Sequence, residues 1–234
     1  MMTAYKLLFI HGAGGTKNKW RSLNNQLGSI QYEAIDLPGH GDNECNIITS
    51  IQDYASFVSN GITEDTIVVG HSMGGLVALE LAARNNRVKA IVLVASFYEL
   101  PVHEKLLEKL SNGEYPKSLI RASYGNDAKE ALIEEAKEEL NLVPVGVSYA
   151  DFRATNEYKD GKKILANLSI PVCAILGTED RLIPQNAVDA LKELQPDISI
   201  FTIDGVGHYP MLENPEQFSA TLQQFVSDVQ VENI

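Results

Sequence analysis

Short apolar runs alternate with amphipathic stretches along most of this chain. The apolar runs predict β-strands near residues 5–10, 31–36, 66–70, 88–94, 171–176 and 198–203. The stretches between them repeat apolar residues at helical spacing and predict helices near 19–28, 50–60, 73–84, 186–194 and 215–229. This alternation favours an α/β fold, with a mostly parallel sheet of about six strands and helices on both faces.

The alternation stops between residues 97 and 165, where no strand is evident and charged residues are denser. Two groups of apolar residues recur there at helical spacing, Val102, Leu106, Leu107 and Leu110, and then Ala128, Ala131, Leu132, Ala136 and Leu140. We interpret residues 97–165 as a helical lid or cap, inserted into one core of residues 1–96 and 166–234. Such an insertion would lie over the C-terminal edge of the sheet, where open α/β sheets bind ligands.

Composition excludes several classes of partner. The 234 residues suit one domain, and the formal net charge of −12 argues against nucleic acid and anionic membranes as partners. Cys45 and Cys173 lie far apart and do not suggest a disulfide framework. The spacing of His and Cys indicates no metal, and we expect no cofactor. No apolar stretch reaches membrane-spanning length and no signal peptide is evident, so we expect a cytoplasmic protein of unknown oligomeric state.

The pentapeptide 70–74, Gly-His-Ser-Met-Gly, is the strongest chemical signal in the chain. It joins the predicted strand 66–70 to the predicted helix 73–84. A serine on a sharp strand-to-helix turn, with a glycine two residues before it and another two after it, is typical of the nucleophile elbow of serine hydrolases. Ser72 is therefore the candidate nucleophile.

A serine hydroxyl needs a base, and the base needs an orienting carboxylate. His208 lies in a glycine-framed loop after the last predicted strand, at the sheet edge that also carries Ser72. Asp180 follows the strand 171–176 at the same edge and precedes His208, the chain order of this kind of hydrolase. Glu179 is the competing neighbour, and Glu99 is a more distant alternative. We predict a triad of Ser72, Asp180 and His208.

The oxyanion of an acyl-transfer reaction also needs donors. We expect one from the backbone N–H of Met73, directly after the nucleophile, and the other from the backbone N–H of Ala13, in the loop after the first strand. Strand alternation should turn His71 away from Ser72 into the core, while His40 and His11 should support neighbouring loops. Candidate substrate-binding side chains are Trp20, Tyr149, Phe152 and Met211, although such residues more often pack in a core or a lid.

With these motifs the chain resembles the α/β-hydrolase superfamily, in particular small serine carboxylesterases that carry a lid. The resemblance rests on His11-Gly12 with Trp20, the segment 36–41 (Asp-Leu-Pro-Gly-His-Gly), the elbow, and the segment 177–180 followed by Gly207-His208. The tail 213–216 (Glu-Asn-Pro-Glu) is also similar. The family often has two antiparallel strands before its first parallel strand. We expect these strands to be absent here, which leaves about six.

The resemblance implies hydrolysis of a small carboxylic ester through an acyl-enzyme intermediate. Thioesters, lactones and carbon–carbon bonds are alternatives on the same triad, because substrate choice depends on the lid. Dinucleotide binding is a competing hypothesis from residues 5–36, but the third glycine of that fingerprint would fall at Lys17. A non-catalytic receptor or scaffold built on the same fold is a further alternative. The leading interpretation has a small ester or related acyl compound as its only partner.

Overall fold

The computed structural model describes residues 5–24 and 26–232, and its centre is a six-stranded parallel sheet. The spatial order of the strands is β2-β1-β3-β4-β5-β6. Their bounds are β1 (Lys6–Ile10), β2 (Tyr32–Ile35), β3 (Thr66–His71), β4 (Val88–Val94), β5 (Val172–Gly177) and β6 (Ser199–Ile203). The predicted fold class is confirmed, and each predicted strand lies within one residue of its observed bounds.

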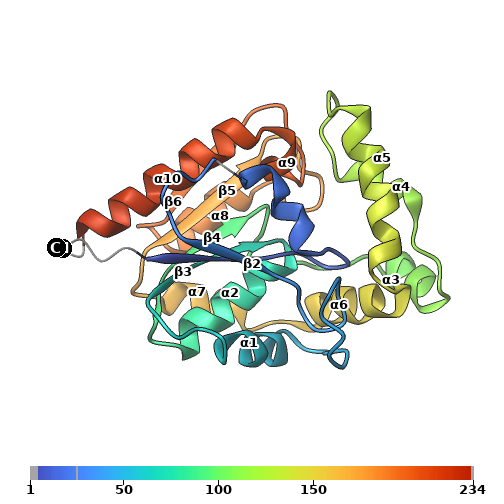
Figure 1. Cartoon of the computed structure of the whole chain (residues 1–234), viewed down its shortest axis with the longest axis horizontal. Helices are drawn as coiled ribbons and strands as arrows, with labels where there is room; N and C mark the ends of the chain where they lie inside the picture. Colours follow the sequence, from blue (N-terminus) through green and yellow to red (C-terminus); the bar gives the residue numbers. More distant parts are fainter. Residues whose placement is uncertain (1–4, 25, 233–234) are drawn as a thin grey trace.

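Helices cover both faces of the sheet (Figure 1). One face packs against α1 (Ile51–Ser59), α2 (Met73–Arg84), α7 (Gly161–Asn167) and α8 (Ala187–Leu194). The other face packs against the 3₁₀ helix η1 (Lys17–Leu23), the short α9 (Pro210–Glu213) and the long α10 (Pro215–Glu232). A sheet buried on both faces needs mainly apolar strands. The interior strands β3 and β5 are buried at every position.

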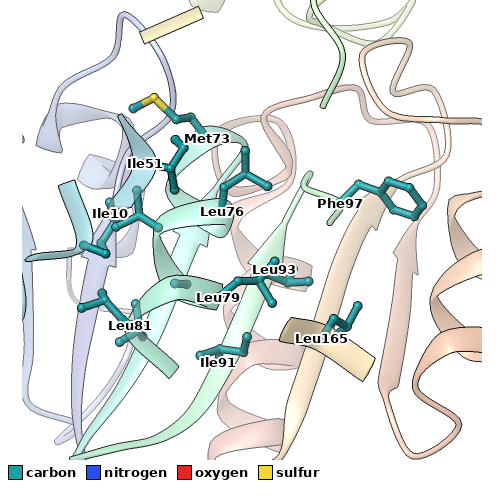
Figure 2. Close-up of a cluster of buried hydrophobic side chains, with 14 of the residues drawn as sticks. Ile10, Ile51, Met73, Leu76, Leu79, Leu81, Ile91, Leu93, Phe97 and Leu165 are labelled. Atoms are coloured by element: carbon teal, nitrogen blue, oxygen red, sulfur yellow. The ribbon is translucent and has the colours of Figure 1, made fainter. Parts of the chain in front are cut away.

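Successive residues of each strand contribute to the two opposite cores. In β1, Leu8 and Ile10 join the α1–α2 side, while Leu7 and Phe9 join the α10 side. Figure 2 shows the first of these cores, where Leu93 of β4 lies close to Leu79 of α2 and Leu165 of α7. Leu93 has no exposed surface. Burial on this scale fixes the strand register, because a slip by one residue would exchange the two faces.

The strand order places a topological switch between β1 and β3. From β1 the chain goes to the edge strand β2 and then returns past β1 to form β3. The segments that follow β1 and β3 therefore leave the sheet on opposite faces, η1 on one and α2 on the other. In open α/β sheets a crevice forms at this point, outside the C-terminal ends of the strands. The residues directly after β1 and β3 include Ala13 and Ser72.

Between β4 and β5 the regular elements are all helices, joined by loops. They are α3 (Glu104–Ser111), α4 (Lys117–Ala122), α5 (Glu130–Glu139), the 3₁₀ turn η2 (Leu140–Leu142), α6 (Val145–Glu157) and then α7. In Figure 1, α3, α4 and α5 stand away from the sheet, whereas α7 lies against it. Ala154 of α6 and Leu165 of α7 belong to the main core. Only Ile120, Tyr124, Ile133 and Ala136 form a separate small cluster. The projecting part is thus α3–α5, and α6 joins it to the core.

The helix predicted over 19–28 is wrong in form and extent. The structure has a 3₁₀ helix over Lys17–Leu23, and Asn25 lies outside the described residues. Thr16 caps it by accepting a hydrogen bond from the backbone N–H of Asn18. In a 3₁₀ helix residues three apart lie on one side, so Trp20 and Leu23 both face the core.

Both cysteines are free, Cys45 exposed and Cys173 buried in β5. Within residues 5–24 and 26–232, none of the helices combines the length and the hydropathy that crossing a bilayer requires.

Because Leu93 is buried at the centre of the sheet, we expect Leu93→Ala to lower the free energy of unfolding by about 2–5 kcal/mol. The change leaves a cavity that rigid neighbouring strands cannot close. Urea unfolding followed by circular dichroism measures the loss. Val231→Ala is the control, since Val231 is 61% exposed, and it should change stability by less than about 0.5 kcal/mol. A loss below about 1 kcal/mol for Leu93→Ala would contradict this view of the core.

Candidate active site

Ser72 occupies a strained backbone conformation between β3 and α2. Its φ is 51° and its ψ is −119°, in a region that residues with a side chain rarely adopt. Three hydrogen bonds hold it there. The Ser72 N–H donates to the Val94 carbonyl at 2.9 Å, and the Ser72 carbonyl accepts from Ser96 Oγ at 2.7 Å and from the Gly75 N–H at 2.9 Å. The turn lifts the side chain of Ser72 out of the sheet edge.

The two glycines of the pentapeptide are required by close backbone contacts. A Cβ at Gly70 would lie 2.1 Å from the Gly74 carbonyl oxygen, and a Cβ at Gly74 would lie 2.4 Å from the Ile10 carbonyl oxygen. Both obstacles are main-chain atoms that cannot rotate away. The elbow therefore depends on the neighbouring strand β1 as well as on its own sequence.

His208 and Asp180 are brought together from two loops at the C-terminal edge of the sheet. His208 Nδ1 lies 2.8 Å from Asp180 Oδ2, and the Asp180 side chain has no exposed surface. The other carboxylate oxygen accepts the Leu182 N–H at 2.8 Å. Glu179 instead accepts the N–H of Asn126. The contact leaves Nε2 of His208 as the ring nitrogen available to a partner.

His71 is buried beside the elbow and positions the His208 loop. Its Nε2 lies 2.8 Å from the His208 carbonyl oxygen and donates to it. Burial, followed by the nearby His208, lowers the pKa of His71 well below its usual value, so the ring is neutral. The expectation of a packed core histidine is confirmed. The side chain also contributes a bond that fixes the main chain of His208.

The loop after β1 includes the N–H of Ala13, which has no hydrogen-bond partner in the part of the chain that the structure describes. The next two N–H groups are both bonded. The Gly14 N–H donates to Asp151 Oδ2 at 2.8 Å, and the Gly15 N–H donates to the Gly12 carbonyl at 3.1 Å. The N–H of Met73, the first residue of α2, likewise has no hydrogen-bond partner among the described residues. A free N–H at a helix start is suited to binding developing negative charge.

Asp151 of α6 joins the insertion to this loop through a fully buried network. Besides the Gly14 N–H, it accepts the Tyr54 hydroxyl at 2.6 Å and contacts His40 Nε2 at 2.8 Å. Neither Asp151 nor His40 has exposed side-chain surface. Burial by itself would lower the pKa of His40, but the hydrogen bond and charge of Asp151 outweigh it and raise that pKa. Both ring nitrogens of His40 meet acceptors, Nε2 the Asp151 carboxylate and Nδ1 the Pro38 carbonyl oxygen at 3.0 Å, which requires a proton on each. His40 and Asp151 thus form a buried ion pair that also fixes the turn at Pro38.

Glu213 of α9 braces the His208 loop on both sides of the histidine. Its Oε1 accepts the N–H of Gly207 at 3.0 Å and of Tyr209 at 3.3 Å. Its Oε2 accepts the Gly125 N–H of the insertion at 2.8 Å. The insertion also binds the loop directly, because the His208 N–H donates to the Ser123 carbonyl at 2.7 Å. These hydrogen bonds, together with that from His71, hold the main chain around His208 between the core and the insertion.

A cavity of about 610 Å³ lies between this sheet edge and the insertion. Its floor includes Gly12, Ala13, Ser72 and His208. Its walls come from α3 and the segment before it, from α4, from α6 and from the loop after Asp180. A cavity of this size is typical of small-molecule sites. No group of three His, Cys, Asp or Glu that could hold a metal ion occurs among residues 5–24 and 26–232.

The four candidate substrate-binding residues separate into two groups. Phe152 lines the cavity, on the α6 wall. Trp20 is 2% exposed and packs on Phe9 and Phe218, and Met211 is fully buried in the same core. The structure thus places Trp20 and Met211 in the core on the α10 face of the sheet, because η1 and α9 pack on that face. Tyr149 is half-buried on α6 and is not among the residues that line the cavity.

Sequence reasoning missed Asp151, Glu213 and Ser123. Asp151 and Glu213 carry no local signature, since their partners lie more than 85 residues away along the chain or in a neighbouring loop. Ser123 acts through its backbone carbonyl, which any residue type provides. For Glu213 a signal did exist, because it opens the family-like tail 213–216.

The model of the alpha/beta hydrolase family matches residues 7–221, which is most of the chain. The chain belongs to the alpha/beta hydrolase family. The matched residues include the elbow, the whole insertion and the His208 loop, so the family assignment covers every part of the site described above.

Several relatives and solved structures that resemble the chain are named as esterases, and one relative is named as a lipase. The chain is 27% identical to a "Pimeloyl-[acyl-carrier protein] methyl ester esterase" of Neisseria meningitidis serogroup C, over 96% of this chain and 94% of the relative. It is 26% identical to "Lipase 3" of Moraxella sp., over 91% and 74%. A "thermophilic esterase" structure is 27% identical with a TM-score of 0.82, over 95% and 90%. An esterase from Thermogutta terrifontis has a TM-score of 0.85 at 21% identity, over 97% and 91%. The chain is an esterase-like hydrolase of this family.

We expect Asp151→Asn to destabilise this hydrolase by about 3–5 kcal/mol, because it leaves the buried His40 cation without its carboxylate. Urea unfolding at neutral pH measures the change. Asp197→Asn is the matched control, since Asp197 is exposed, and it should cost less than about 0.5 kcal/mol. A cost for Asp151→Asn as small as that of the control would show that the buried pair is not charged.

Two buried histidines predict a loss of stability in mild acid. Burial lowers the pKa of His11 to about 4 and lowers that of His71 further below its usual value. Below pH about 6.5 the unfolded chain takes up protons at these imidazoles and the folded chain does not. The free energy of unfolding therefore decreases as the pH decreases, by up to about 1.4 kcal/mol per pH unit for each histidine. The pKa of His40 is raised on folding, so its contribution to the free energy of unfolding is lost as the pH rises above that value.

Urea unfolding between pH 7 and pH 4.5 measures this slope. His71→Gln keeps a donor for the His208 carbonyl but takes up no proton, so its slope should be smaller by about one proton. An equal slope for His71→Gln and for the unmodified protein would show that His71 is protonated in the folded state.

Proposed function

We propose that this chain hydrolyses small carboxylic esters through an acyl-enzyme, with Ser72 as nucleophile, His208 as general base and Asp180 as the orienting acid. The observation that carries the proposal is the 2.8 Å contact between His208 Nδ1 and Asp180 Oδ2 at the cavity that Ser72 also lines. This contact fixes the tautomer with a proton on Nδ1, so Nε2 has the lone pair that a base needs.

In the first half-reaction the Ser72 Oγ attacks the ester carbonyl carbon, and its proton passes to His208 Nε2. The carbonyl oxygen becomes an oxyanion, for which the free N–H groups of Ala13 and Met73 are the proposed donors. The tetrahedral intermediate then breaks its bond to the alcohol oxygen. That oxygen takes the proton from His208, the alcohol leaves, and the acyl group stays on Ser72.

In the second half-reaction water takes the place of the alcohol. His208 removes its proton as it attacks the acyl carbon, and the same two N–H groups stabilise the new oxyanion. The bond to Ser72 Oγ breaks, the serine recovers a proton from His208, and the acid leaves. Asp180 stays ionised throughout and stabilises the imidazolium in each intermediate.

Ester hydrolysis is favoured over the other reactions of this triad by the names of the relatives. These include methyl ester esterases and a lipase at 26–27% identity over most of the chain. A methyl ester of an acyl chain is therefore a suitable test substrate, beside thioesters and lactones. The apolar wall of Phe152, Leu106 and Leu119 fits an acyl chain. We assign the lid function to α3–α6, which close the cavity over Ser72.

The test is labelling with a fluorophosphonate probe together with turnover of p-nitrophenyl esters of graded acyl length. Ser72→Ala should abolish both. His208→Ala should lower kcat by at least about 10³-fold, because it removes the general base. Asp180→Asn should lower kcat by a similar factor, because it removes the carboxylate that fixes the tautomer of His208. Activity should also fall as the pH drops into the range where an imidazole takes up a proton.

Glu179→Gln is the matched control for Asp180→Asn, since Glu179 is the adjacent carboxylate and bonds Asn126 instead of His208. It should retain activity within about tenfold. Labelling that persists in Ser72→Ala would refute the nucleophile assignment. Labelling without turnover of any ester would instead favour a non-catalytic receptor.

A further inference from the structure

The cavity over Ser72 has the opposite charge to the rest of the chain. The whole protein carries a formal charge of −12, with 31 acidic and 19 basic residues. Four cationic side chains line the cavity, those of Lys19, Lys105, Lys109 and Arg181, and no Asp or Glu is among the residues that line it. A local reversal of this kind concentrates anions in a cleft whose surroundings repel them.

Two of these cations have no carboxylate partner. Lys19 forms an ion pair with Glu139, and Lys109 lies 3.8 Å from Glu114. Lys105 makes no ion pair with any residue of the part of the chain that the structure describes. Arg181 donates to the side-chain oxygen of Asn126 at 2.6 Å, which is a neutral acceptor. The charges of Lys105 and Arg181 are therefore available to a ligand.

The two free cations come from different walls of the cavity. Lys105 lies on α3, where Lys109 follows four residues later on the same side of the helix. The acidic residues of this helix, Glu104 and Glu108, are not among those that line the cavity. Arg181 comes from the loop after β5, directly after Asp180. Two walls of the cavity, α3 and this loop, therefore each carry a free cation.

The remaining lining is mainly apolar. Leu100, Leu119, Phe152 and Leu182 line the same cavity. An apolar chamber of about 610 Å³ with uncompensated positive charge suits a ligand that is apolar at the reacting end and anionic elsewhere. A wholly apolar ester would leave both cations without a partner.

We propose that the substrate is an ester that carries a carboxylate or a phosphate group, bound by Lys105 and Arg181 while the ester carbonyl lies at Ser72. This proposal rests on the hydrolase function proposed above and specifies its substrate class. The anion supplies orientation, because it fixes one end of the substrate, and it speeds encounter with a protein that otherwise repels negative charge. The benefit depends on salt, since both cations are exposed to solvent.

The first experiment uses p-nitrophenyl esters of one acyl length whose far end is a carboxylate, a phosphate or a neutral carboxamide. We expect at least one anionic ester to have a kcat/KM about tenfold or more above that of the carboxamide. The ratio should shrink as NaCl rises from 10 mM to 500 mM, because the Debye length falls. Whichever anion gives the larger ratio identifies the group. Equal values for all three esters at low salt would overturn the proposal.

The second experiment reverses the charges. Lys105→Glu and Arg181→Glu should each lower the ratio of anionic to neutral kcat/KM about fivefold, and the double variant more than tenfold. Lys129→Glu and Arg87→Glu are matched controls, because both residues are exposed, neither lines the cavity, and the net charge changes equally. The double control should keep the ratio of the unmodified protein. An unchanged ratio in Lys105→Glu/Arg181→Glu, or an equal fall in the double control, would overturn the proposal.

These results separate the substrate class from the function itself. If the carboxamide ester is turned over and the probe labels Ser72, but charge has no effect, then the anion site is refuted and the hydrolase function stands. If no ester is turned over and Ser72 is not labelled, then the proposed function is refuted and the anion site with it.

Discussion

The close approach of β1 to the elbow is the constraint on which the rest of the site depends. Ser72 is held at a φ of 51°, and the backbone around it leaves no space for a Cβ at Gly70 or Gly74. The obstacle at Gly74 is the carbonyl of Ile10, the last residue of β1. This contact therefore fixes where the loop after β1 begins. The free Ala13 N–H lies at the same cavity as the nucleophile because the loop starts beside the elbow and is held there by Asp151.

The helical insertion is part of the site's scaffold. It holds the His208 main chain through the Ser123 carbonyl, it meets Glu213 through the Gly125 N–H, and it holds the loop of Ala13 through Asp151. The carboxylate of Asp151, in the insertion, is satisfied by donors from the core, and that of Glu213, in the core, by donors from both parts. Separation of the two parts would leave buried charge and backbone groups without partners, at a cost of several kcal/mol. Motion of the insertion as one rigid body is thus disfavoured by its own contacts.

The sequence predicted the sheet and its edge far better than the insertion. The interior parallel strands are mainly apolar, so their bounds are visible without any partner, and Ser72, Asp180 and His208 are found because each lies in the turn or loop that follows a strand. In the insertion, helices α4, α6 and α7 were not predicted, since they are short or only weakly amphipathic. Trp20 and Met211 look like pocket residues by type. Their burial in the core depends on the face of the sheet against which η1 and α9 pack, and no local sequence pattern predicts that face.

The contacts of the insertion also indicate where its sequence is free to change. Segments that bond the sheet-edge loops, around Ser123 and Asp151, are tied to the geometry of His208 and Ala13. Helix α3 is different. Among the described residues its side chains form no hydrogen bond with those loops, and yet it supplies Lys105 and Leu106 to the cavity wall. A substitution on α3 can alter what the cavity accepts while the elbow, the base and the free N–H groups stay in place. Bond cleavage and substrate choice are thus separable in this fold, and α3 is the element at which they separate.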